Sequence, residues 1–173
     1  PIFASLTREQ EQSTEATVKE VIRRLRSYQT VDGSFSYWPG GTAPNAWGTV
    51  YAIHFLLEAE KKGYLVPEGM KRNALNDLSR IARNWKPEAS YSAESEEMTQ
   101  AYRLFVLALG QVAEVGAMNR LKESKTLMSM SRYLLAAGYA LVGRPDVSKE
   151  LVVKTTALTT ACSGYDQTFG SDL

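Results

Sequence analysis

Residues 28–41 read YQTVDGSFSYWPGG and connect two stretches of helical periodicity. Within this run, Asp32 and Gly33 predict a turn, because glycine readily adopts the positive φ that other residues resist. Three aromatic residues follow the turn directly: Phe35, Tyr37 and Trp38. We therefore expect an ordered connection that is held in place by packing, with a helix on either side of it.

Helical periodicity dominates the chain, and no strand-period run of any length appears. We expect helices over residues 13–28, 46–62, 67–85, 96–115, 117–123, 127–142 and 145–161. The first, third and last each carry one apolar stripe, which predicts half-buried helices. The second, fourth and sixth are apolar on nearly every side, which predicts burial all round. The third helix is expected to turn six residues outward: Lys71, Arg72, Asn76, Asp77, Arg80 and Arg83.

This alternation of outer amphipathic helices and inner apolar helices predicts an all-α fold, an incomplete α/α toroid built from helical hairpins. Residues 165–172 resemble the connection at residues 28–35, and the chain stops where the next inner helix would begin. We therefore expect residues 1–173 to form a single domain that is part of a larger toroid, with both ends being cuts. An open toroid edge would also allow a fragment dimer.

The composition argues against a nucleic-acid-binding protein. The chain has 173 residues, 44% of them hydrophobic, and a formal net charge of +1. A net charge this small gives no electrostatic case for nucleic acid or for an anionic membrane. The basic run Arg23, Arg24 and Arg26 is offset by Glu15 and Glu20, so we interpret it as a solvated helix face. No apolar run is long enough to span a bilayer, and no signal peptide is visible.

Few residues offer catalytic or metal-binding chemistry. His54, the only histidine, lies between apolar neighbours and is expected to be a buried, hydrogen-bonded side chain. Cys162, the only cysteine, is expected to be a small buried apolar residue. Glu94, Glu96 and Glu97 are better explained as negative charge at a helix N-terminus than as a cation site. Metal-ligand and phosphate-loop motifs are absent from the sequence, so we expect no catalytic residue, no metal and no cofactor.

Four aromatic residues are the weak candidates for a binding surface: Tyr37, Trp38, Trp47 and Tyr51. They could line a concave face and stack on a sugar or a peptide. Alternatively, they fix the first turn against the second helix. In that case Trp47→Ala would unfold the chain, since deleting a buried tryptophan typically costs ~3–5 kcal/mol.

The pattern in residues 29–38, 47–57 and 63–67 resembles the thioester-domain region of bacterial α2-macroglobulin-like proteins. The resemblance extends over roughly residues 17–110 and continues more loosely to Leu173. It implies a protease inhibitor rather than an enzyme, located in the periplasm or on the outer cell surface. In this family a Cys and a Gln three residues later form an internal thioester. When a protease cleaves the bait region of the inhibitor, the thioester is exposed and captures a nucleophile covalently. The implied partners are proteases and other domains of the parent chain.

The chain departs from this family pattern at two places. It has no Cys-X-X-Gln, because Cys162 is followed three residues later by Tyr165, and the family motif lies before the first helix seen here. Residues 88–98 match a turn that carries a histidine in complement proteins, but they contain none. No catalytic residue is therefore carried over. Two alternatives remain open, an α/α-toroid enzyme such as a polysaccharide lyase or cyclase, and a helical-repeat binding module.

Overall fold

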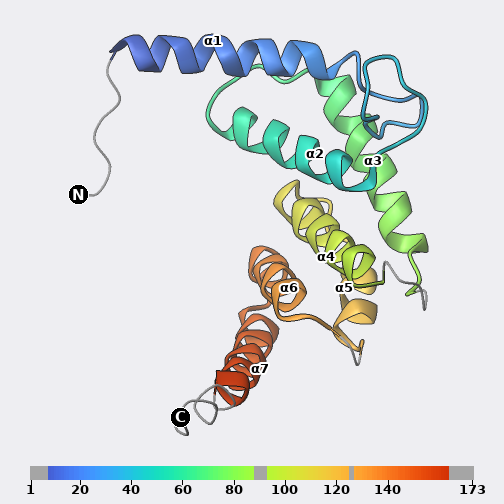
Figure 1. The fold of residues 1–173 in the computed structure, drawn as a ribbon, viewed down its shortest axis with the longest axis vertical. Coiled ribbons are helices and arrows are strands. Elements are labelled where there is room, and N and C mark those ends of the chain that lie inside the picture. Colours follow the sequence, from blue (N-terminus) through green and yellow to red (C-terminus); the bar gives the residue numbers. More distant parts are fainter. Residues whose placement is uncertain (1–7, 88–92, 125–126, 164–173) are drawn as a thin grey trace, which may run out of the picture. The chain divides into compact units, whose positions relative to one another are not determined.

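The computed structural model describes residues 8–87, 93–124 and 127–163 (Figure 1). Across these ranges the regular secondary structure is helical. Two isolated β-bridges are present, but no β-strand is formed within the described residues. The helices are α1 Arg8–Leu25, α2 Ala46–Lys61, α3 Glu68–Asn84, α4 Ala93–Leu109, α5 Val115–Lys122, α6 Ser129–Leu141 and α7 Pro145–Ser163. The predicted all-α class is confirmed. None of the helices in the described part of the chain is both long and apolar enough to cross a membrane.

The chain divides into two compact units, residues 1–78 and residues 79–173. The first unit holds α1, α2 and most of α3, and the boundary falls inside α3 after Leu78. The second holds the end of α3 and α4 to α7. The expectation of one domain over residues 1–173 stays a prediction.

In the first unit, the connection between α1 and α2 is ordered by hydrogen bonds. The Gln29 side-chain amide donates to the Gly33 carbonyl at 3.1 Å and to the Met70 carbonyl of α3 at 2.9 Å. The backbone N–H of Asn45 donates to the Phe35 carbonyl at 2.8 Å. Phe35 itself is buried. The connection is thus fixed to α3 at one end and to the start of α2 at the other. It is ordered as predicted, but hydrogen bonds and the buried Phe35 hold it, and the predicted packing of Tyr37 and Trp38 is wrong because both side chains are exposed.

The turn at Gly33 packs directly on the backbone of α3. Gly33 has φ +107°, and a Cβ there would lie 2.7 Å from the carbonyl carbon of Asn73. Beside it, the Ser34 hydroxyl donates a short hydrogen bond to the Asp77 carboxylate, and both residues are buried. The prediction that Asp77 faces outward is therefore wrong, because Ser34 brings a donor to the buried face of α3.

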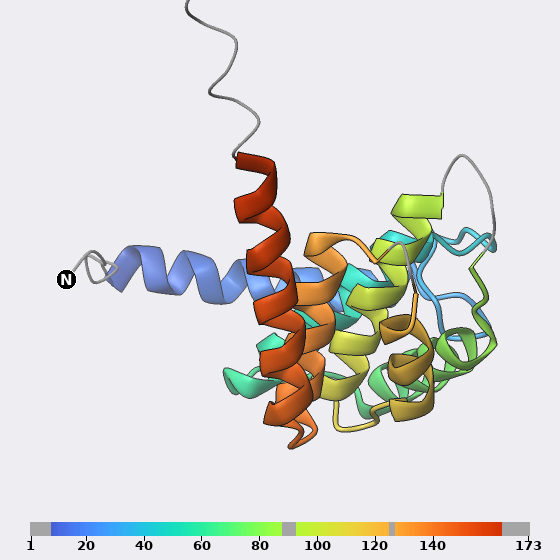
Figure 2. The same cartoon turned by 90° about the horizontal axis from the view of Figure 1, so that it is seen from below.

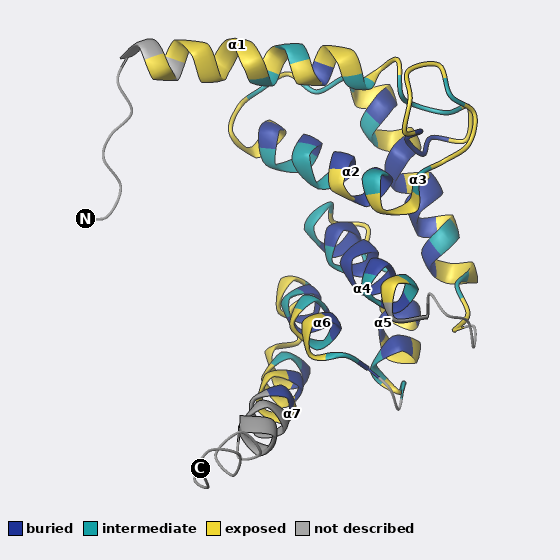
Figure 3. Cartoon of the chain, viewed as in Figure 1, coloured by how far each residue is buried: buried dark blue, intermediate teal, exposed yellow. Residues whose placement is uncertain are grey.

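Burial in the first unit is one-sided (Figure 3). Of the described side chains of α1, Ile22 alone is buried, and residues 12–17 are all exposed. On α2, Val50 and Leu56 are fully buried while Tyr51 is exposed. The prediction that α2 is buried all round is wrong, because the described chain covers only one side of it.

In the second unit, α6 lies between α4 and α7, and α5 packs against α4 and α6 (Figure 2). The α4–α6 contact is close at Gly138, where a Cβ would lie 3.6 Å from the Cα of Phe105. The buried Tyr139 donates its hydroxyl to the Asn119 side-chain oxygen of α5 at 2.6 Å. Burial raises the pKa of Tyr139 above its ordinary value.

The outer sides of α6 and α7 differ from the sequence pattern. Met130 and Tyr133 of α6 are exposed, so the prediction of all-round burial is wrong for this helix as well. On α7, Val147 and Leu151 of the predicted stripe are buried, whereas Val152 is exposed. Three predicted features lie outside the described residues and side chains: the Leu158 stripe position, the Cys162 side chain and the repeat at residues 165–172.

Candidate functional site

The four candidate aromatic residues are all exposed and form two pairs in the first unit. Tyr37 and Trp38 are 67% and 70% exposed, and their rings meet edge to face with centroids 4.9 Å apart. Trp47 and Tyr51 lie one turn apart on α2 and are 44% and 65% exposed. The interpretation that these side chains fix the turn against α2 is wrong for Tyr37, Trp38 and Tyr51, because such contacts would bury them. Trp47 is more than half covered and has an interaction partner, so the unfolding expected for Trp47→Ala stays a prediction.

Polar contacts hold the two aromatic pairs on neighbouring segments. Ser36 forms an isolated β-bridge with Pro44, just before Tyr37 and just before α2. Asn45 caps α2 by accepting the Gly48 N–H on its side-chain oxygen at 2.6 Å, as predicted. Thr49 then accepts the Phe35 N–H at 2.9 Å.

The other candidate residues, His54, Glu96 and Glu97, interact with other groups of the protein. His54 is half-buried on α2 and has an interaction partner. Glu96 lies in the first turn of α4, while the buried Glu97 accepts the backbone N–H of Met128, the N-cap of α6, at 2.9 Å. Glu97 thus caps a different helix from the one that the sequence suggested. Within the described residues, no three His, Cys, Asp or Glu side chains come together as a metal site would require.

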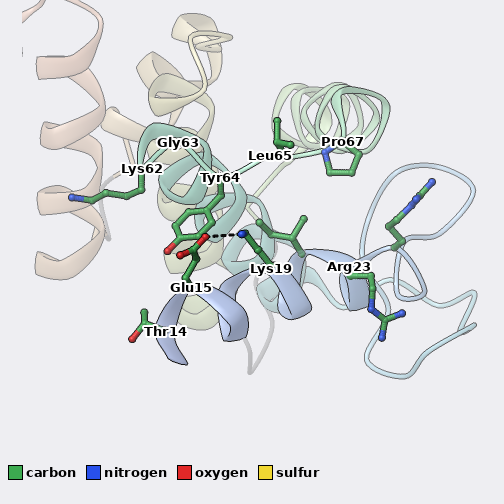
Figure 4. A pocket seen from close by; sticks show the side chains of 11 residues that line it. Thr14, Glu15, Lys19, Arg23, Lys62, Gly63, Tyr64, Leu65 and Pro67 are labelled. Carbon is green, nitrogen blue, oxygen red and sulfur yellow. Dashed lines mark hydrogen bonds and ion pairs between the residues drawn. The ribbon is translucent and has the colours of Figure 1, made fainter. Parts of the chain in front are cut away.

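A groove of about 800 Å³ runs along α1 in the first unit (Figure 4). One wall is α1 from Thr14 onward together with Arg26 just past its end, and the other is the α2–α3 connection at residues 62–67. Tyr64 of that connection points toward Glu15 and Lys19 (Figure 4). The groove therefore combines the charged face of α1 with a loop that is apolar apart from Lys62.

Several charged side chains of α1 form ion pairs with one another. Lys19 lies 2.6 Å from Glu15, and Arg23 and Arg24 each lie 2.7 Å from Glu20. The hydrogen bonds from Arg23 and then Arg24 lower the pKa of Glu20 to about 2. The Glu15 contact raises the pKa of Lys19, and Lys19 lowers that of Glu15. The prediction of a charge-balanced, solvated face is confirmed for Arg23 and Arg24, whereas the exposed Arg26 forms no ion pair with any described residue.

The groove itself could not be found from the sequence. Periodicity places Lys19, Arg23 and Arg26 along one side of a helix, but nothing in it shows that residues 62–67 fold back beside them.

A second cavity of about 600 Å³ lies in the second unit. There Arg120 donates to the Arg83 carbonyl at 2.8 Å, which satisfies the C-terminal end of α3.

Two bacterial proteins show what the sequence is similar to. The chain is 29% identical to alpha-2-macroglobulin of Escherichia coli (strain K12) over 138 residues, which is 78% of this chain and 8% of that protein. It is 31% identical to alpha-2-macroglobulin of Xylella fastidiosa (strain Temecula1 / ATCC 700964) over 126 residues, or 69% of this chain and 8% of that protein. None of the established family profiles matches the chain.

The fold shows the same likeness. The cryo-EM structure of native E. coli alpha-2-macroglobulin matches 88% of this chain with a TM-score of 0.76 and 22% identity, using 10% of that structure. A crystal structure of the native E. coli protein from domain MG7 to the C-terminus matches 87% of this chain with a TM-score of 0.75 and 22% identity, using 24% of that structure. This chain is alpha-2-macroglobulin-like.

The match confirms the α/α-toroid fragment that the helix order predicted. The alpha-2-macroglobulin-like chain spans about 8% of the length of the two relatives. Of residues 88–98, which match the histidine-bearing turn of complement, residues 88–92 lie outside the described part of the structure. The absence of a histidine there is a fact of sequence.

Proposed function

We propose that the chain is part of the helical thioester-type domain of a bacterial protease inhibitor and acts as a scaffold rather than as a catalyst. One observation carries the proposal: sequence likeness to bacterial alpha-2-macroglobulins over more than two thirds of the chain coincides with a fold match at TM-score 0.76. The protein partners would be proteases, met through the full-length parent. Its place would be the periplasm or the outer cell surface.

The geometry of the first unit supports a scaffold role. The connection at residues 28–45 is fixed by backbone and side-chain hydrogen bonds, so the backbone that carries Tyr37 and Trp38 is held in place. Exposed aromatic side chains on a fixed backbone suit contact with another protein surface. We propose that Tyr37, Trp38, Trp47 and Tyr51 contact another domain of the parent chain.

The test of inhibition uses the full-length protein that contains this chain. It is mixed with trypsin, and cleavage of a large protein substrate is compared with cleavage of a small chromogenic peptide. We expect slower cleavage of the protein substrate and continued cleavage of the peptide, because a trapped protease is shielded only from large substrates. Unchanged cleavage of both substrates would contradict the proposal.

A second measurement separates two versions of the inhibitor. The full-length protein is treated with methylamine, and its intact mass and free thiols are measured. A methylamine adduct with one new thiol indicates a working thioester outside this chain. Inhibition without an adduct indicates a relative that shields proteases sterically.

The aromatic contact has its own test. Hydroxyl-radical footprinting compares the modification of Trp38 in residues 1–173 alone and in the full-length protein. We expect protection of Trp38 in the full-length protein, with the already buried Tyr139 modified little in both. Equal modification of Trp38 in the two proteins would show that no other domain covers it.

A further inference from the structure

The groove along α1 carries an excess of positive charge. Its lining includes four cationic side chains and one carboxylate: Lys19, Arg23, Arg26, Lys62 and Glu15. Lys19 is paired with Glu15, and Arg23 with Glu20. Among the described residues, Arg26 and Lys62 form no ion pair, so each can bind a carboxylate from outside without breaking an existing contact.

Apolar side chains occupy the same groove. Ile22 of α1 is buried in it, and Pro67 closes the end of the α2–α3 connection. Leu65 is 93% exposed although it belongs to the lining. An apolar side chain placed on Leu65 would remove apolar surface of both side chains from water, which favours binding.

The dimensions of the groove fit an extended peptide. From Thr14 to Arg23 the α1 wall rises by about 14 Å at 1.5 Å per residue, and Arg26, just past the end of the helix, lengthens it. An extended chain at about 3.3 Å per residue covers the helical part alone with four or five residues. A small anion would occupy only a fraction of a groove of about 800 Å³.

We propose that this groove binds an extended acidic peptide segment that carries apolar side chains between its carboxylates. The carboxylates would pair with Arg26 and Lys62, and an apolar side chain would lie on Leu65. The site is separate from the scaffold role proposed above and does not depend on protease inhibition. The peptide segment would come from outside residues 1–173.

The probe is a fluorescein-labelled hexapeptide of alternating glutamate and leucine, titrated with the 173-residue chain by fluorescence polarisation at low salt. A hexapeptide of alternating lysine and leucine is the control peptide. We expect saturable binding of the acidic peptide and about tenfold weaker binding, or none, of the basic one. Equal binding of both peptides, or no binding of the acidic one, would overturn the proposal.

Charge reversal locates the binding. In the double variant Arg26→Glu and Lys62→Glu, we expect about tenfold or greater loss of affinity, because two attractive contacts become repulsive. The matched control is Arg72→Glu and Lys149→Glu, which changes the net charge equally at exposed positions outside the groove. Equal losses of affinity in the two variants would show that only the net charge matters, and would overturn the assignment of the binding site to the groove. Circular dichroism checks that both variants keep their helices.

The apolar contact is tested by a peptide in which glycine replaces each leucine. We expect this peptide to bind several-fold more weakly than the leucine peptide, and Leu65→Ala to remove most of the difference. Full competition by inorganic phosphate at the concentration of the peptide would indicate a small-anion site and would contradict the peptide assignment.

Discussion

Gly33 and Gly138 each bring two chain segments close together, but the contacts differ in what lies opposite. At Gly33 the turn meets the backbone of α3, and φ is +107°. At Gly138, within a regular helix, the nearest atom to an added Cβ is the terminal methyl of Met118, at 3.2 Å. Backbone cannot move without disturbing its helix, whereas a methionine methyl can rotate away. Gly33 is therefore required by the fold, whereas a small side chain at position 138 can be accommodated by movement of Met118.

The largest expected effect is that of Gly33→Ala. A side chain there is strained at positive φ and also overlaps the Asn73 carbonyl group, so we expect a loss of about 3 kcal/mol in the free energy of unfolding. Urea denaturation followed by circular dichroism measures it. Gly40→Ala is the matched control, because Gly40 has φ +72° but open space around it, and we expect a loss of only about 1 kcal/mol. Equal losses would show that the backbone contact contributes nothing.

The next effect concerns the hydrogen bond beside Gly33. Ser34→Ala removes the donor to the buried Asp77 carboxylate, and we expect a loss of about 2 kcal/mol, as for hydrogen bonds to charged groups. The loss should shrink when Asp77 is already replaced by Ala, which a double-mutant cycle measures. Additive losses would mean that the two side chains do not interact.

A smaller effect is expected at the polar contact of the second unit. Tyr139→Phe keeps the buried ring and removes its hydroxyl, which donates to Asn119. Because Asn119 is exposed, water can replace the lost donor, and we expect a loss of about 1 kcal/mol. A loss as large as that of Ser34→Ala would show that solvent does not reach Asn119.

Gly138→Ala should change the free energy of unfolding by less than about 1 kcal/mol, because the gain in helix propensity offsets the crowding of Met118. The same denaturation experiment measures it. A loss comparable to that of Gly33→Ala would remove the distinction between the two glycines.

The smallest effect is a pH dependence on exposed α1. The folded-state pKa of Glu20 is about 2, against an ordinary 4.5, so its stabilising contacts are fully present above pH 4.5 and are lost as the pH falls toward 2. An NMR titration should place the Glu20 midpoint near 2 and show fraying of the end of α1 over this range. Glu20→Gln should abolish the fraying step, and an ordinary Glu20 midpoint would refute the ion-pair geometry.

Several elements were predictable because the signals were local. The turn at Gly33, the Asn45 cap and the apolar stripe of α3 depend on residues within one or two turns of each other. The ends of helices were less predictable: α1 ends at Leu25 rather than Tyr28. The hydrogen bonds of the following connection, among them Ser36 N–H to the Tyr28 carbonyl, compete with continuation of the helix.

The candidate site was predictable as a set of residues but not as a surface. The sequence singled out Tyr37, Trp38, Trp47 and Tyr51, but a hydrophobicity pattern cannot tell a buried aromatic side chain from an exposed one. The same limit explains Asp77, a charged residue that becomes buried because Ser34 reaches it from 43 positions away. Glu97 likewise finds its partner 31 positions along the chain, at Met128.

The sequence by itself determined the helical class, the order of the helices, the turn chemistry at Gly33 and the family likeness, because each follows from short-range periodicity or from a local motif. Only the tertiary structure decided which faces are covered, which polar groups are paired, and that residues 62–67 lie beside α1 to form a groove. Those properties depend on contacts between residues that are distant in the chain, and such contacts leave no period in the sequence.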